Sequence, residues 1–214
     1  MEFDFDEMVR IECYKLMTST IVPRPIGFIT TVGEDGVVNA APYSFFNGMC
    51  SEPPIVVFGM EVHPGFAPQQ DTRENLRHCS EFVANLVSED IVEQMNMCSM
   101  NFPPDVDELA ETGLTAVPST KVTPPRIKES PVSFECRKLT AMEFGPGNQI
   151  VLGQIVHMHV KDEFVMDAEK RYIDTPALKL IGRMHGTGMY AKTSDLYEMP
   201  RPPAYADWIK TKTD

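Results

Sequence analysis

The chain of 214 residues lacks the patterns that mark several large classes of protein. No apolar run reaches the roughly 18 residues of a membrane-spanning helix. The acidic start MEFDFDEMVR has neither the basic nor the apolar region of a signal peptide. Basic residues number 19 against 31 acidic ones, and a formal charge of −12 argues against a nucleic-acid partner. We therefore expect a soluble cytoplasmic protein that binds neither nucleic acid nor membranes.

Motifs of several enzyme classes are also missing. The sequence contains no GxSxG, no HExxH and no Rossmann glycine fingerprint. Its cysteines are odd in number and include no CxxC, so neither a disulfide framework nor a zinc cage is predicted. We expect reduced, mostly buried thiols at Cys13, Cys50, Cys79, Cys98 and Cys136.

Strand-forming segments are abundant. Ile26–Val32 is apolar and rich in β-formers, and the following Gly33–Gly36 has the composition of a hairpin turn. Val37–Phe46 is expected to continue as the second strand, but Pro42 cannot donate a ladder hydrogen bond. This strand should therefore be an edge strand or carry a bulge at Pro42, and bulges often flank active sites.

The rest of the chain alternates strands with short helices. Helices are predicted where capping residues precede apolar patterns, from Asp71 with Glu74, from Ser88 to Cys98, and from Asp105 with Glu108 to Gly113. Further strands are predicted at Ile55–Met60, Glu81–Val87, Val132–Phe144 and Ile150–Val160, the last two joined around Gly145–Asn148. The pattern predicts a mainly β protein, a small antiparallel barrel with peripheral short helices. We expect one domain over residues 1–214, with a C-terminal extension from about residue 190.

Three segments resemble one protein family. The first runs from Arg24 to Pro54 and contains RPIGFITT, GEDG, NAAPYSFFN and SEPP; the others are Asp71–Ser88 and Ile181–Pro202. Together they resemble the flavin reductase-like, FMN-binding split-barrel proteins. One departure is Gln70, which stands where family members often carry lysine.

The resemblance implies a split barrel of Greek-key-like antiparallel topology that binds FMN and forms a homodimer. It further implies an oxidoreductase that transfers hydride to the flavin from NAD(P)H, a transient reductant. The reduced flavin would then serve a partner oxygenase or stay and reduce a bound substrate.

Candidate flavin-binding residues follow from the demands of the ligand. Its ring needs aromatic contact, its edge needs donors and acceptors, and its phosphate needs amides, hydroxyls or cations. Along one strand Tyr43 and Phe45 would share a face opposite Phe46, and Asp71 with Thr72 opens a helix whose N-terminus attracts anions. Without the resemblance, the same residues fit an ordinary packed strand pair and helix cap. The candidates are Arg24, Thr30, Thr31, Tyr43, Ser44, Phe45, Phe46, Asn47, Asp71 and Thr72.

Two other functions stay open. One is a flavin-binding electron carrier without NAD(P)H turnover. The other is a metal-dependent barrel enzyme, because His157 and His159 share a strand face and, with Glu163, resemble the HxHxxxE half of a cupin metal site. His185 lies in a glycine-rich segment that lacks the pattern of a phosphate loop.

Overall fold

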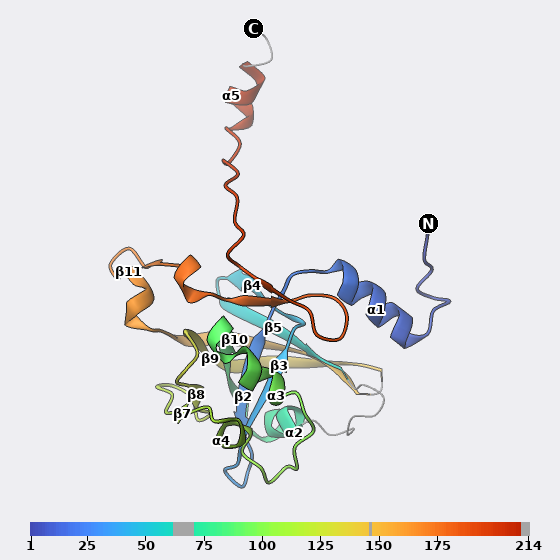
Figure 1. Ribbon diagram of the computed structural model, residues 1–214, viewed down its shortest axis with the longest axis vertical. Helices are drawn as coiled ribbons and strands as arrows, with labels where there is room; N and C mark the ends of the chain where they lie inside the picture. Colours follow the sequence, from blue (N-terminus) through green and yellow to red (C-terminus); the bar gives the residue numbers. More distant parts are fainter. Residues whose placement is uncertain (62–70, 146, 211–214) are drawn as a thin grey trace.

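A seven-stranded antiparallel sheet forms the body of the protein (Figure 1). The computed structural model describes residues 1–61, 71–145 and 147–210. In spatial order the strands are β3 (Val38–Tyr43), β2 (Gly27–Val32), β6 (Glu81–Leu86), β9 (Val132–Phe144), β10 (Asn148–Val160), β5 (Pro54–Met60) and β4 (Phe46–Ser51). The expected mainly β, antiparallel architecture is confirmed.

The two edge strands of this sheet are neighbours in sequence. Only Ser44 and Phe45 separate β3 from β4. The carbonyl of Phe45 accepts a hydrogen bond from the Gly59 amide on β5 at 2.8 Å. Because the chain passes from one edge to the other in two residues, the sheet must curl until its edges approach.

The prediction of one strand over Val37–Phe46 is therefore wrong. The chain turns a corner at Ser44 and Phe45, whereas Pro42 lies inside β3, opposite Phe28. Proline is tolerated there because β3 is an edge strand, as one of the two sequence-based alternatives required. The corner also overturns the predicted alternation, since Tyr43 and Phe46 are both buried in the same core cluster.

The long hairpin of β9 and β10 agrees closely with the prediction. Strand β9 ends at Phe144, and β10 begins at Asn148, two residues before the expected start. The described turn residues Gly145 and Gly147 have φ angles of 61° and 91°, which side chains with a Cβ rarely adopt. Pro146 lies outside the described residues.

The helices are short and peripheral. The structure has α1 (Arg10–Thr20), which no sequence pattern predicted, α2 (Asp71–His78), α3 (Val92–Met97), α4 (Glu108–Thr112) and α5 (Tyr205–Lys210), with 3₁₀ turns at Glu89–Ile91, Asp162–Phe164 and Pro176–Leu178. The predicted helix from Ser88 to Cys98 divides into a 3₁₀ turn and α3. The cap of α4 is Asp107 and not Asp105, since the Asp107 carboxylate accepts from the Leu109 and Ala110 amides. Gly113 ends α4 as expected.

Three small sheets complete the fold. They are β1 (Arg24–Pro25) with β13 (Ile181–Arg183) and β14 (Tyr190–Lys192), β7 (Ala116–Val117) with β8 (Arg126–Ile127), and β11 (Val165–Asp167) with β12 (Tyr172–Ile173). The first of them ties residues near position 24 to residues near position 183, because Arg24 pairs with Arg183.

Two hydrophobic clusters lie on the two faces of the main sheet. One, on the concave side, includes Phe58, Phe82 and Val151. The other packs Phe28 of β2 against side chains of α3 and α4. Adjacent residues of β2, Phe28 and Ile29, belong to different clusters, as the alternation of a strand requires.

The C-terminal segment leaves the body of the molecule. After β14 the chain extends outward to α5 (Figure 1). Its apolar side chains are exposed, with Tyr197 84% and Tyr205 72% accessible. Among the described residues no helix is both long and apolar enough to cross a membrane.

All five cysteines lie in the described part of the chain, and none forms a disulfide. The expectation of mostly buried thiols holds only for Cys98 and Cys136. Cys50 is exposed, and the other two are half-buried.

Candidate functional site

A cavity of about 840 Å³ lies against the corner between β3 and β4. Its walls come from segments far apart in sequence: α1, the β3–β4 corner, the start of α2, the end of α3 and the segment around β13 and β14. The volume falls in the range of small-molecule and cofactor sites. Five of the sequence-predicted site residues line it: Tyr43, Ser44, Phe45, Asp71 and Thr72.

Aromatic rings form one wall of the cavity. The Phe45 ring meets Tyr14 of α1 edge-on, with 6.4 Å between the ring centroids. Tyr43 leans on the core ring of Phe58 at 5.1 Å. Tyr14 also lines the cavity, whereas Phe58 is a fully buried core residue, so Phe45 is held within the wall and Tyr43 is held by the core.

A buried polar network joins β2 and β3 to the start of α2. The Asn39 side-chain amide donates to the Thr72 hydroxyl at 2.8 Å and to the Thr31 hydroxyl at 3.2 Å. Asn75 of α2 donates to the same Thr31 oxygen at 3.0 Å. The Tyr43 hydroxyl also hydrogen-bonds Thr72, and burial raises the pKa of Tyr43 strongly. This network fixes the first turn of α2, where Asp71 and Thr72 reach the cavity.

Among the described residues, three carboxyl groups line the cavity: those of Glu61, Asp71 and Glu108. Burial raises the pKa of Glu108 to about 7, although the Ala40 amide donates to its carboxylate at 2.8 Å. The negative charges of Asp71 and Asp107 raise it further. Burial and the nearby Glu74 also raise the pKa of Asp71. The shift of Glu108 lessens the negative charge that an anionic ligand would meet near neutral pH.

Arg24 lies beside the cavity but not in its wall. Its guanidinium is buried, with 4% of the residue exposed, and donates to three backbone carbonyls. Those acceptors are Thr18 and Ile21 at 2.8 and 2.9 Å and Met184 at 3.1 Å. A longer contact of 3.4 Å reaches the Ser44 hydroxyl. Most donors of this predicted phosphate ligand are therefore already used inside the protein.

Arg183 is a cavity residue outside the set predicted from the sequence. It lines the cavity, and its guanidinium carbon lies 4.7 Å from the Tyr190 ring centroid. Its Nη2 donates weakly to the Gly186 carbonyl at 3.4 Å. Its Nη1 is buried and has no hydrogen-bond partner among the described residues. The Arg183 guanidinium is thus held by fewer protein acceptors than that of Arg24, and as part of a cavity-lining residue it is a candidate donor to a ligand.

The remaining predicted residues lie away from the cavity. Thr30 is buried and donates to the Pro125 carbonyl at 2.5 Å, and Thr31 belongs to the polar network. Phe46 is core, and among the described residues the exposed Asn47 side chain accepts only from the neighbouring Gly48 amide. The cofactor roles of these four stay predictions. Gln70, which stands where family members often carry lysine, lies outside the described residues.

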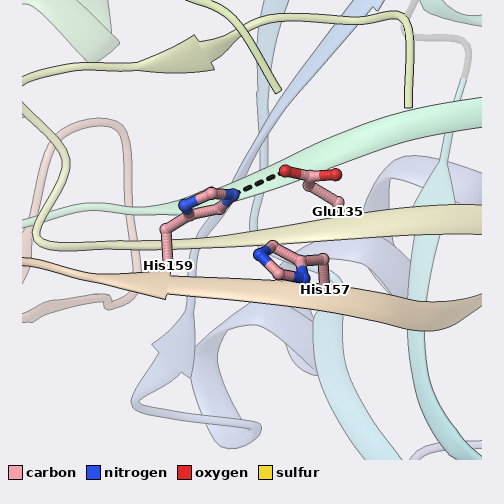
Figure 2. Close-up of side chains that lie close together, drawn as sticks. All are labelled: Glu135, His157 and His159. Carbon is pink, nitrogen blue, oxygen red and sulfur yellow. Dashed lines mark hydrogen bonds and ion pairs between the residues drawn. The ribbon is translucent and has the colours of Figure 1, made fainter. Parts of the chain in front are cut away.

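A second polar group lies on another part of the sheet. His157 and His159 on β10 meet Glu135 of β9, and not the expected Glu163 (Figure 2). Glu163 is exposed in a 3₁₀ turn. The HxHxxxE pattern therefore does not form the three-residue group that it suggested. His185 is exposed in the turn that follows β13.

Comparisons with known proteins agree with this architecture. Residues 17–176 match the family model described as the flavin reductase like domain. The structure is similar to a 2-nitrobenzoate 2-nitroreductase of Pseudomonas fluorescens, with a TM-score of 0.86 and 30% identity, over 95% of this chain and 98% of that one.

Two further solved structures extend the comparison. Nitrilotriacetate monooxygenase component B of Bacillus cereus has a TM-score of 0.85 and 31% identity, over 93% of this chain and 98% of that one. A split-barrel-domain protein of Shewanella frigidimarina shares the fold, with a TM-score of 0.78 and 22% identity, over 94% and 100% of the two chains. The split-barrel fold expected from the sequence is confirmed.

Proposed function

Because the chain belongs to the family of the flavin reductase like domain, we propose that it is an oxidoreductase that binds FMN in the cavity at the β3–β4 corner. The observation that carries the proposal is the cavity itself, which Tyr43, Phe45 and Arg183 line together. The Arg183 guanidinium can donate to a flavin phosphate. When bound, the flavin accepts hydride at N5 from C4 of NAD(P)H, and the chemistry is the cofactor's own.

The protein's task in this proposal is to position the cofactor. Phe45 and Tyr43 offer ring contact, while the Ser44 hydroxyl and the corner backbone offer polar groups to the edge of the isoalloxazine. Thr72 and the first turn of α2 lie on the side of the polar network, where the helix N-terminus favours an anion. Arg183 adds positive charge, which the overall charge of −12 does not supply.

Binding of the FMN phosphate depends on the charge of the acidic residues that line the cavity. A carboxylate at Asp71 or Glu108 repels a phosphate, but the pKa of about 7 leaves Glu108 only partly charged near pH 7. Nicotinamide would bind transiently above the flavin, since the sequence has no dinucleotide fingerprint of its own. The same absence supports FMN over FAD, because no separate adenosine pocket is expected.

The decisive experiment is a titration of the apoprotein with FMN, FAD and riboflavin, followed by steady-state oxidation of NADH and NADPH with the bound flavin. We expect FMN to bind more tightly than FAD, and NAD(P)H oxidation to require the flavin. Equal or tighter FAD binding would contradict the cofactor assignment. Flavin binding without NAD(P)H turnover would favour an electron carrier instead.

A partner oxygenase also belongs to this proposal. The similar protein from Bacillus cereus is component B of a nitrilotriacetate monooxygenase. By analogy we propose that reduced FMN leaves this protein and serves a separate oxygenase. The proposal requires exchangeable flavin, so the Kd for FMN should rise on reduction. Flavin that stays bound through many turnovers would contradict it.

We also propose that two copies associate. The segment after Lys192 projects from the body and exposes Leu196, Tyr197, Tyr205 and Trp208. Such side chains lose contact with water only if another surface covers them. Light scattering should give a dimer mass for the full chain and a lower apparent association constant for the Y205S/W208S double variant. A monomer mass with FMN bound would contradict the proposal.

A further inference from the structure

The group formed by Glu135, His157 and His159 is built from two adjacent strands of the main sheet. Glu135 on β9 and His157 on β10 are direct register partners. The register shifts between Ile155 and His157, so that His157 and not Val156 stands opposite the carboxylate. His159 follows two residues later and therefore shares the face of His157. One nitrogen or oxygen from each side chain lies within 4.8 Å of the others.

The carboxylate of this group is fixed by the backbone. Glu135 is fully buried, and its two oxygens accept from the consecutive amides of Thr120 and Lys121 at 2.7 and 2.6 Å. Burial alone would raise the pKa of Glu135, but these hydrogen bonds and that from His159 hold it below its usual value. A carboxylate accepts at about four positions, so Oε2 still has a lone pair to offer, and Oε1 gains one if its contact with His159 opens.

The two histidines differ in how they are held. Nε2 of His159 lies 2.5 Å from Oε1 of Glu135, and the dashed line in Figure 2 marks this contact. His157 is half-buried, and its imidazole makes no hydrogen bond among the described residues. It touches His159 edge-on, with 4.8 Å between ring centroids. An imidazole held only by a ring contact can turn toward a ligand without breaking a hydrogen bond.

From this geometry we infer that Glu135, His157 and His159 form a binding site for a divalent transition metal such as Zn²⁺. Two imidazole nitrogens and one carboxylate oxygen suit such ions. The ion would take the place of the hydrogen bond between His159 and Glu135. The amides of Thr120 and Lys121 would orient the carboxylate from behind, as outer partners do in metal sites.

The movements required are small. Bonds of about 2.1 Å place the ligand atoms of one ion roughly 3.0–3.4 Å apart. The pair of His159 and Glu135 must therefore open by somewhat under 1 Å, while His157 approaches from its present distance within 4.8 Å. Three protein ligands leave at least one position for water. The site would tie β10 to β9 and to the segment 119–121, which is a stabilising role independent of the flavin cavity.

The test uses the tag-free full chain, first treated with a chelator, and then titrated with Co²⁺ in visible absorption and with Zn²⁺ in calorimetry. We expect one equivalent of metal and the visible bands of nitrogen- and oxygen-bound Co²⁺. Zn²⁺ at a hundred times its Kd should raise the unfolding midpoint by roughly 5–10 °C. Failure of the chain to bind a stoichiometric ion would overturn the assignment.

His157→Gln is the critical variant, because the replaced ring has no hydrogen bond whose loss could unfold the protein. Loss of an outer partner typically weakens a metal site ten- to a hundredfold, so loss of a direct ligand should weaken Zn²⁺ binding at least tenfold. The matched control is His78→Gln, which removes another histidine next to a glutamate, 3.1 Å from Glu34 on the surface. Unchanged affinity in His157→Gln, or equal losses in both variants, would reduce the group to a structural pair of His159 with Glu135.

Discussion

Two arginines that face each other across one short ladder behave in opposite ways. Arg24 and Arg183 are register partners in β1 and β13. Arg24 donates to three carbonyls from two distant parts of the chain, whereas Arg183 has a buried nitrogen without a partner among the described residues. One guanidinium therefore holds the fold together, and the other is available to a ligand.

The difference shows what makes a cation a candidate for binding. The sequence favoured Arg24 because Pro23 and Pro25 stiffen its backbone. A positioned guanidinium, however, serves whichever acceptors are nearest, and here these are carbonyls left free where α1 ends. The number of donors that remain unused decides between a structural and a binding role.

Removing Arg24 should have the largest effect, and on stability. Arg24→Ala leaves the carbonyls of Thr18, Ile21 and Met184 short of their donor. We expect the free energy of unfolding to fall by about 3–5 kcal/mol, measured by urea denaturation. FMN affinity per folded molecule should change little. A stable variant that has lost FMN binding would reverse the roles of the two arginines.

Arg183→Ala should change binding and leave stability almost unaltered. Loss of a hydrogen bond to a charged group costs about 1.5–3 kcal/mol, so the Kd for FMN should rise roughly ten- to a hundredfold. Riboflavin, which lacks the phosphate, should bind the variant as tightly as it binds the wild type. If riboflavin is weakened equally, Arg183 contacts the ring or shapes the cavity, and the phosphate lies elsewhere.

Glu108→Gln tests the acidic group that lines the same cavity as Arg183. Folding raises the pKa of Glu108 from 4.5 to about 7. A carboxyl group whose pKa is higher in the folded than in the unfolded protein stabilises the fold when it is protonated. This stabilisation is complete below the unfolded pKa of 4.5 and is lost as pH rises through the folded pKa of about 7. From about pH 5 to about pH 8 the wild type should lose roughly 1–3 kcal/mol relative to Glu108→Gln. Parallel pH profiles of the two proteins would show that this carboxyl is not buried in its neutral form.

The sequence predicted most strands of the main sheet because their patterns are local. Strand β9 has its predicted limits, Val132–Phe144, and β6 ends one residue before its expected limit. The prediction failed at Ser44 and Phe45, where β-forming residues continue through a corner. Only the pairing of Phe46 with Phe58 and of Phe45 with Gly59 reveals the turn, and these contacts are distant in sequence.

The site was predicted in part for the same reason. Tyr43, Ser44, Phe45, Asp71 and Thr72 line the cavity, and two contiguous segments of the resemblance supply them. Glu108 belongs to a predicted capping pattern and Arg183 to the third segment of the resemblance, but neither pattern places these side chains at the cavity. Their positions depend on β13 pairing with β1 and on α4 packing near β3, which no spacing in the sequence specifies.

The two-residue corner also limits how the length of this chain can vary. Since side chains alternate along β4, one inserted residue after Phe45 would shift the pairing with β5 and turn Phe46 out of the core. Position 59 is constrained as well, because a Cβ there would lie 3.3 Å from that of Phe45. We therefore expect homologous chains to differ in length at the exposed turn Gly33–Gly36 and to keep the span from Tyr43 to Gly59 constant.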